Sequence, residues 1–275
     1  MTDSSIFKEN IFEGKKVFIT GGATGMGLGF AKSFLNHGAE VIIASRKEDN
    51  LSLASEEAEK ETGKGLLWKV MDVRDNESVE RVADFIKEEW GHLDILVNNA
   101  AGNFISPVAS MSENAWRAVV DIVLDGTFRV SKACYPLLRK SKSGSSIVNI
   151  IANYAWNAAP FVAHSGAAKA GVLNLTRTLA LEWASDNIRV NAFCPGVVLT
   201  ENVKKNLMLD EKTAKMFEDY IPLGGVTDTN KMAQQVLYLC SSAADVITGD
   251  MLIADGGQWL VGNAFYQAGK QFMNE

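Results

Sequence analysis

Short runs of β-branched and aliphatic residues alternate along this chain with longer amphipathic segments, and this alternation is what most constrains the fold. The runs occupy residues 17–19, 41–43, 66–70, 95–97, 147–150, 189–193 and 251–253. Helix-length segments, such as 77–90 and 172–184, lie between them. Strands that alternate with helices predict right-handed crossovers and a parallel sheet. The sequence therefore predicts one α/β domain over residues 1–275, a doubly wound parallel sheet of about seven strands with helices on both faces.

The composition is that of an ordinary soluble globular protein, with 47% apolar and 22% charged residues. A net charge of −6 argues against general nucleic-acid binding but leaves room for a local basic site. Cys134, Cys194 and Cys240 lack the spacing of a metal site, so we interpret them as reduced core thiols and expect no metal. No run approaches the roughly 18 apolar residues of a membrane span, and the first residues form no signal region. We therefore expect a cytoplasmic location.

A glycine-rich stretch at residues 20–27 directly follows the first predicted strand and opens a helix. Glycines let the backbone turn sharply and approach a pyrophosphate, whose charge then meets a helix N-terminus. An ordinary glycine-rich turn is the alternative, but the strand-to-helix context favours a Rossmann-type dinucleotide site. The contacts expected from this stretch are Gly21, Thr24, Gly25, Met26 and Gly27.

The end of the second predicted strand bears on the choice between NAD(H) and NADP(H). An acidic residue there accepts hydrogen bonds from the ribose 2′-hydroxyl of NAD(H), but this chain has Ser45, Arg46 and Lys47. A hydroxyl and a guanidinium suit the 2′-phosphate of NADPH. The alternative is that Arg46 and Lys47 form a solvated helix start. We favour NADPH, and we expect Asp72 and Val73, after the third strand, to flank the adenine.

Three further motifs resemble signatures of the short-chain dehydrogenase/reductase family. Together with the glycine-rich stretch, they extend the resemblance over nearly the whole chain. They are residues 98–102 (NNAAG), 191–200 (NAFCPGVVLT) and 255–257 (DGG). The resemblance implies that Asn99 and Ala100 belong to the cofactor site. It also implies that the backbone of Pro195, Gly196 and Val198 holds the nicotinamide carboxamide, to which Thr200 adds a polar contact.

The chain departs from that family where the catalytic acid is expected. The family pattern is Tyr-x-x-x-Lys, and here Ser165 stands four residues before Lys169. The usual serine about thirteen residues upstream falls near Ala152 and is also missing. A serine hydroxyl is a far poorer proton donor than a phenol, whose reference pKa is about 10. Tyr154, two residues past Ala152, suggests a rebuilt site and a different carbonyl chemistry.

Within the family, four stretches resemble 2,4-dienoyl-CoA reductases: 99–107, 121–127, 154–156 and 164–171. The resemblance implies that Tyr154 and Asn103 bind the substrate thioester oxygen and that Lys169 and Ser165 hold the cofactor. It implies NADPH-dependent reduction of a 2,4-dienoyl-CoA thioester to 3-enoyl-CoA in unsaturated fatty-acid degradation (β-oxidation). A homotetramer is the family expectation.

The proposed chemistry suits these residue types. Hydride addition at the δ-carbon of a dienoyl thioester pushes charge onto the thioester oxygen, which a phenol and an amide can stabilise. No alkoxide needs a proton, so the usual Ser/Tyr pair is dispensable. Asp121 is a candidate relay partner for a water on Lys169, and we expect the Asp125 carboxylate to point away from the site.

Each assignment has a plainer alternative. Ser165 and Lys169 share a helix face, as many surface pairs do. Asn103 is also suited to capping the segment that follows, and Tyr154 to packing beside Trp156. We interpret His164 as a helix-entry residue rather than a catalyst.

The long connection at residues 200–226 suggests either a surface excursion or a lid over an apolar substrate. Four lysines in this connection either contact CoA phosphates or form a solvated helix face: Lys204, Lys205, Lys212 and Lys215. Two other functions compete with dienoyl reduction. One is 3-ketoacyl or 2-enoyl thioester reduction in the same family, and the other is a non-catalytic NADPH-binding sensor. The sequence does not determine which acyl chain length or double-bond geometry of the substrate the protein accepts.

Overall fold

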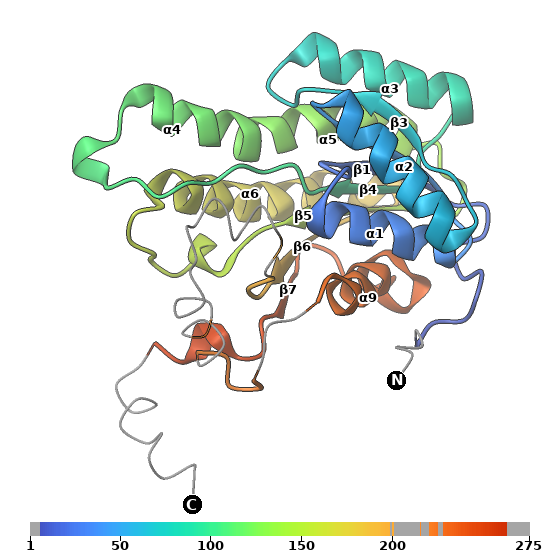
Figure 1. Cartoon of the computed structure of the whole chain (residues 1–275). Helices are drawn as coiled ribbons and strands as arrows, with labels where there is room; N and C mark the ends of the chain where they lie inside the picture. Colours follow the sequence, from blue (N-terminus) through green and yellow to red (C-terminus); the bar gives the residue numbers. More distant parts are fainter. Residues whose placement is uncertain (1–5, 199, 201–214, 216–219, 225–227, 263–275) are drawn as a thin grey trace, which may run out of the picture.

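The computed structural model describes residues 6–198, 200, 215, 220–224 and 228–262. Within them, parallel strands form one sheet in the order β3-β2-β1-β4-β5-β6-β7 (Figure 1). The strands are β1 (Lys16–Thr20), β2 (Glu40–Ser45), β3 (Leu67–Val70), β4 (Ile95–Asn98), β5 (Ser145–Ile150), β6 (Ile188–Pro195) and β7 (Met251–Ala254). The predicted doubly wound parallel sheet is confirmed, with a strand at each of the apolar runs.

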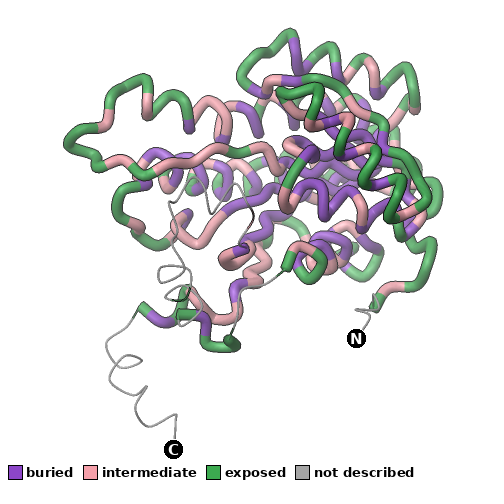
Figure 2. Tube along the Cα trace, in the orientation of Figure 1, coloured by how far each residue is buried: buried purple, intermediate pink, exposed green. Residues whose placement is uncertain are grey.

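Helices cover both faces of the sheet. One face carries α1 (Gly25–Asn36), α2 (Glu48–Thr62) and α9 (Thr229–Cys240). The other carries α3 (Asn76–Trp90), α5 (Gly126–Leu138) and α6 (Ala163–Glu182), with α4 (Glu113–Val120) beside α6. Within β1, Val17 and Ile19 pack into the first layer and Phe18 into the second, because successive strand residues point to opposite faces. Figure 2 shows the strands buried between layers whose outer turns are exposed.

Helix α6 begins at Ala163, beside the predicted helix-entry residue His164 and ahead of the predicted helical segment at 172–184. Its first turns are built from small residues such as Gly166 and Ala167, which give no apolar periodicity to read from sequence. Ala168 and Lys169 are nevertheless buried. The early start places Ser165 and Lys169 on a helix, one turn apart.

The crossover between strands β1 and β4 defines the functional edge of the sheet. Strands β1 and β4 are neighbours, but the chain leaves β1 toward β2 and leaves β4 toward β5, in opposite directions along the sheet. In open α/β sheets, ligands bind outside the carboxyl ends of the strands at such a switch point. The expected lid at residues 200–226 lies largely outside the described residues, as do Lys204, Lys205 and Lys212.

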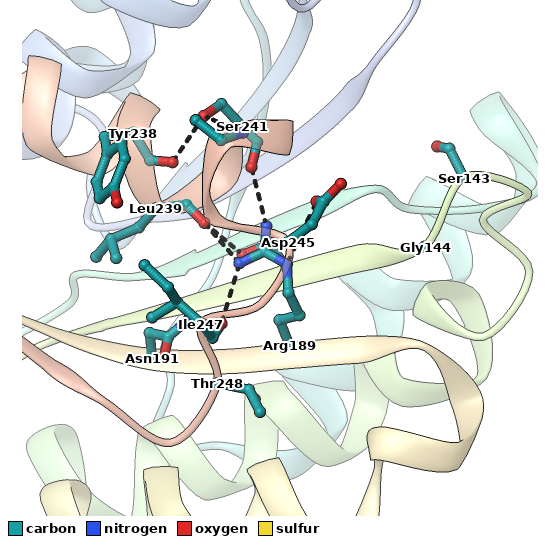
Figure 3. A network of polar contacts seen from close by, with 12 residues as sticks. Ser143, Gly144, Arg189, Asn191, Tyr238, Leu239, Ser241, Asp245, Ile247 and Thr248 are labelled. Carbon is teal, nitrogen blue, oxygen red and sulfur yellow. Dashed lines mark hydrogen bonds and ion pairs between the residues drawn. The ribbon is translucent and has the colours of Figure 1, made fainter.

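Arg189 in β6 ties the end of α9 to the approach to β7 (Figure 3). Its Nη1 donates to the Leu239 carbonyl at 2.9 Å and lies 3.4 Å from the Ile247 carbonyl, while Nη2 lies 3.4 Å from the Ser241 carbonyl. A helix ends in carbonyls without intrahelical donors, which a guanidinium satisfies well. Arg189 therefore joins β6, α9 and the loop before β7 into one unit, and β6 runs from there to the site.

We predict that Arg189→Met lowers the free energy of unfolding by about 1.5–3 kcal/mol, because hydrogen bonds to a charged donor are lost. The Arg189 side chain is only 14% exposed, so water replaces the lost donor poorly. Urea denaturation checks this. Arg81→Met is the matched control, because Arg81 is 66% exposed and its change should stay within about 0.5 kcal/mol. Equal effects from the two substitutions would contradict the structural role of Arg189.

Candidate active site

The turn between β1 and α1 has no room for side chains at its glycines. Gly21 and Gly25 have φ angles of +63° and +56°, in the left-handed region. A Cβ on Gly27 would lie 2.3 Å from the Gly21 carbonyl oxygen and 2.6 Å from Asn99 Nδ2. The backbone is therefore drawn into a tight cradle at the start of α1, as the predicted pyrophosphate site requires.

Asn99 and Thr20 fasten this cradle to the neighbouring strand. Asn99 Nδ2 donates to the carbonyls of Thr20 and Gly21, at 3.0 and 3.1 Å. Thr20 Oγ1 accepts the backbone N–H groups of Asn99 and Ala100, both at 3.0 Å. The predicted site residues Asn99 and Ala100 thus shape the glycine turn. Thr20 was missed from sequence; its signal is a hydroxyl at the very end of a buried strand.

A charged cluster lies beyond the ends of β2 and β3. Arg74 Nη2 lies 2.6 Å from an Asp72 carboxylate oxygen, and Arg74 Nε donates to the same carboxylate. These hydrogen bonds hold the pKa of Asp72 below its usual range, and the charge of Arg46 acts in the same direction. Ser45 ends β2, and Arg46 is exposed just after it. The sequence analysis missed Arg74, which orients the carboxylate expected beside the adenine.

The end of β6 closes over the glycine turn. A Cβ on Gly25 would lie 3.3 Å from Thr200 Cγ2, so Thr200 lies directly over that turn. A Cβ on Gly196 would lie 2.7 Å from the Asp255 Cα, and the Gly196 N–H donates to Ala254 in β7. Val198 is buried behind this bend, which Pro195 begins. The motifs around residues 20–27, 195–200 and 255–257 therefore meet at one edge of the sheet.

The four predicted catalytic residues come from three segments. Tyr154 lies in a short 3-10 turn, η3 (Asn153–Ala155), whereas Ser165 and Lys169 lie in α6 and Asn103 follows β4. Ser165 Oγ lies 3.3 Å from the Tyr154 hydroxyl oxygen. Burial raises the pKa of Tyr154, while hydrogen bonds from Ser165 and Asn103 lower it. Tyr154 and Ser165 are therefore in direct contact, and the Asn103 side chain lies close enough to affect the pKa of Tyr154.

The orientation of the Asn103 amide follows from its own backbone. Asn103 Oδ1 accepts the Phe104 N–H at 2.9 Å, so the NH₂ group is the side that faces Tyr154. The Tyr154 oxygen accepts a hydrogen bond from Ser165, which leaves the phenolic proton available for a third group.

Lys169 is buried behind this cluster. Its Nζ donates to the Ile150 carbonyl at the end of β5. Burial lowers the pKa of Lys169 to about 8. Burial raises the pKa of Cys194 to about 12, so Cys194 remains a neutral thiol at physiological pH. The charge of Asp121, the candidate relay partner, contributes to the raised pKa of Arg74, and its relay role stays a prediction. The Asp125 carboxylate lies 3.8 Å from Arg129.

Residues 21–258 match the family model described as "Enoyl-(Acyl carrier protein) reductase". The chain belongs to the short-chain dehydrogenase/reductase family. Members of this family bind a nicotinamide cofactor, and the glycine cradle fits such a dinucleotide. The family resemblance drawn from the sequence motifs is thus confirmed.

Relatives of this short-chain dehydrogenase/reductase match it along nearly its whole length. It is 41% identical over 252 residues to a Bacillus subtilis protein named "Probable 2,4-dienoyl-CoA reductase [(2E)-enoyl-CoA-producing]", covering 90% of this chain and 98% of that one. It is 38% identical over 256 residues to a Danio rerio "Peroxisomal 2,4-dienoyl-CoA reductase [(3E)-enoyl-CoA-producing]", covering 93% and 85%. A crystal structure of a short chain dehydrogenase from Bacillus anthracis superposes with a TM-score of 0.77 at 41% identity, covering 89% of this chain and 96% of that chain.

The described residues contain neither a membrane-spanning helix nor a cluster of metal-ligating side chains. No helix in that part of the chain is long and apolar enough to cross a membrane. No three His, Cys, Asp or Glu side chains of the same residues gather as a metal site would require. The homotetramer and the cytoplasmic location stay predictions.

We predict that Lys169→Met makes the cofactor-free protein more stable at pH 7. Between the folded pKa of about 8 and the ordinary 10.5, the unfolded chain binds more protons, so the stability of the wild type rises with pH. The advantage of the methionine variant should therefore shrink as pH rises through this window. Urea denaturation from pH 7 to 10 measures it, with the exposed Lys87→Met as control. A pH-independent difference would show that burial does not penalise the charge of Lys169.

Proposed function

We propose that this protein is an NADPH-dependent 2,4-dienoyl-CoA reductase that forms 3-enoyl-CoA in unsaturated fatty-acid degradation. One observation carries the proposal: Tyr154 approaches Ser165, which occupies the position of the family tyrosine, and hydrogen-bonds it at 3.3 Å. The phenol therefore reaches the site from a different segment than in the family pattern, and the Asn103 side chain lies near it. Two neutral donors side by side suit an enolate oxygen better than they suit proton delivery to an alkoxide.

The residues that would hold NADPH lie around the carboxyl edge of the sheet. We assign its pyrophosphate to the α1 turn, its 2′-phosphate to Ser45 and Arg46, and its adenine to Asp72 and Val73. We assign its nicotinamide end to the β6 bend with Lys169 and Ser165. The full proposed set is Gly21, Thr24, Gly25, Met26, Gly27, Ser45, Arg46, Asp72, Val73, Asn99, Ala100, Ser165, Lys169, Pro195, Gly196, Val198 and Thr200.

When bound, NADPH supplies a hydride for the δ-carbon of the dienoyl thioester. Electron density then moves through two double bonds to the thioester oxygen. The free proton of Tyr154 and the second N–H of Asn103 would stabilise that oxygen as it becomes negative. Ser165 would keep the phenol in place, and its hydrogen bond, together with the nearby Asn103 amide, opposes the rise in the pKa of Tyr154 that burial causes.

The position of the acid bears on which product forms. Protonation of the dienolate at the α-carbon gives a 3-enoyl thioester, whereas protonation at the γ-carbon gives a 2-enoyl thioester. Tyr154 would sit at the carbonyl end of the substrate, beside the α-carbon. This favours the 3-enoyl product named for the Danio rerio relative over the 2-enoyl product named for the Bacillus subtilis one.

A 2-enoyl thioester reductase is the second candidate, and the description of the matching family model favours it. It also forms an enolate, so the same two donors would serve it. A 3-ketoacyl reductase needs an acid for its alkoxide where Ser165 stands. A non-catalytic sensor would have no use for a free phenolic proton.

The first prediction of this proposal concerns the substrate. The purified protein should oxidise NADPH with 2,4-hexadienoyl-CoA and accumulate 3-hexenoyl-CoA, identified by mass spectrometry and NMR. Its activity with 3-ketohexanoyl-CoA should be lower by orders of magnitude, because a serine stands at position 165, where a ketone reductase has the acid for its alkoxide. Preferred reduction of 2-hexenoyl-CoA would favour the second candidate. Inactivity with all three esters, with tight NADPH binding, would favour the sensor.

Tyr154→Phe tests the oxyanion donor. It keeps the buried ring but removes the hydroxyl, and loss of such a donor typically costs about 10²–10³ in turnover. NADPH affinity should hardly change, because Ser165 and Lys169 are intact. Tyr135→Phe is the control, since it removes a hydroxyl bonded to Asp186, away from the cluster. Wild-type turnover by the Tyr154 variant would make that residue a packing side chain.

Arg46→Ala tests cofactor choice. A charge-assisted phosphate contact is worth about 1.5–3 kcal/mol, so the preference for NADPH over NADH should fall by about 10- to 150-fold. Calorimetry with both cofactors measures it, and Lys60→Ala, at the far end of α2, is the control. Equal affinity of the wild type for NADH and NADPH would remove the basis of the assignment.

A further inference from the structure

His164, the second residue of α6, is fully buried beside the proposed catalytic cluster. Its ring packs edge-on against Phe104, with 4.6 Å between the ring centroids. Phe104 follows Asn103 directly, and Ser165 follows His164 directly. The imidazole therefore lies between the two segments that bring Asn103 and Ser165 to Tyr154.

The imidazole supplies a hydrogen-bond acceptor that α6 otherwise lacks. The first N–H groups of a helix have no intrahelical partner, and the N-cap residue Val162 has no side-chain acceptor. The Ser165 N–H instead donates to His164 Nδ1 at 2.8 Å. Because Nδ1 accepts, the ring proton of the neutral imidazole lies on Nε2.

We propose that His164 is a positioning residue that fixes the first turn of α6, so that Ser165 Oγ meets the Tyr154 hydroxyl. The Ser165 backbone amide is held by the imidazole, and its Oγ lies 3.3 Å from the Tyr154 oxygen. Loss of the acceptor frees that turn and lets Ser165 leave the phenol. The consequence for turnover rests on the proposed function, whereas the hydrogen bond itself does not.

The other ring nitrogen shows that packing alone does not explain this histidine. His164 Nε2 is buried and has no hydrogen-bond partner among the described residues. A buried donor without a partner is destabilising, and an apolar ring would pack on Phe104 without that cost. The acceptor at Nδ1 is what an apolar ring cannot supply.

Protonation abolishes this acceptor. Both nitrogens of an imidazolium are donors, so a charged His164 cannot accept the Ser165 N–H. Burial lowers the pKa of His164 below its ordinary 6.5, and the Val162 carbonyl opposes the shift. No charged side chain contributes to that shift. The titratable groups on the surrounding elements are Tyr154 in η3, Lys169 on α6, Cys194 in β6, Glu113 and Arg117 on α4, and Asp121 and Asp125 before α5.

The test compares His164→Asn, which keeps an acceptor near the Nδ1 position and does not titrate, with His164→Phe, which keeps only the ring. The phenylalanine variant should lose about tenfold or more in turnover with 2,4-hexadienoyl-CoA at pH 7.5, and the asparagine variant much less. Wild-type turnover should fall as pH drops below 6.5, and the asparagine variant should lack that fall. His92→Asn, at the opposite end of the sheet, is the control. Equal activity of the two variants, or the same acid limb in wild type and His164→Asn, would overturn the proposal.

Two measurements on the cofactor-free protein separate this inference from the proposed function. The chain has three histidines, so ¹⁵N NMR can follow His164 directly. It should report the Nε2–H tautomer with a pKa below 6.5. In urea denaturation, wild type should lose more stability than His164→Asn as pH falls through that range, because the unfolded chain binds the proton first. An Nδ1–H tautomer or an ordinary pKa would refute the positioning role, even in a protein with no reductase activity.

Discussion

The hydrogen bonds between Asn99 and the end of β1 hold the switch point of the sheet together, and the other site contacts depend on them. They bring the Asn99 amide within 3.1 Å of the Gly21 carbonyl, which leaves no space for a Cβ at Gly27. The start of α1 is thereby drawn against β4. Thr200 can then lie over Gly25 from the far side. A side chain at any of these contacts would separate the strands whose ends form the cofactor cradle.

Burial governs the catalytic cluster. It makes Tyr154 harder to ionise and Lys169 easier to deprotonate, so both groups tend toward their neutral forms. At the phenol, the hydrogen bond from Ser165 and the nearby Asn103 amide partly offset the effect of burial. Burying the charged amine of Lys169 destabilises the fold, and a destabilising group of this kind is commonly retained because it is needed for function.

In the proposed site, a phenol from another segment takes the role of the family tyrosine while the helix stays in place. Ser165 remains on α6 at the family tyrosine position and now orients the replacement from η3. The first turn of α6 therefore has to be held firmly, although its N-cap is a valine. His164 meets that need from inside the helix. The two segments that carry the donors are joined through its contact with Phe104.

The sequence by itself determined the fold class, because apolar runs that alternate with amphipathic segments leave few topologies open. It also marked the residues of the cofactor cradle and the four proposed catalytic side chains, through motifs that lie at strand ends. It did not reveal Thr20 and Arg74, which act on other site residues. The hydrogen bond between Ser165 and Tyr154 and the approach of Asn103 join three segments, and the amide orientation of Asn103 follows from a backbone turn. Only the tertiary structure decided these, because distances between segments and the directions of hydrogen bonds are set by packing.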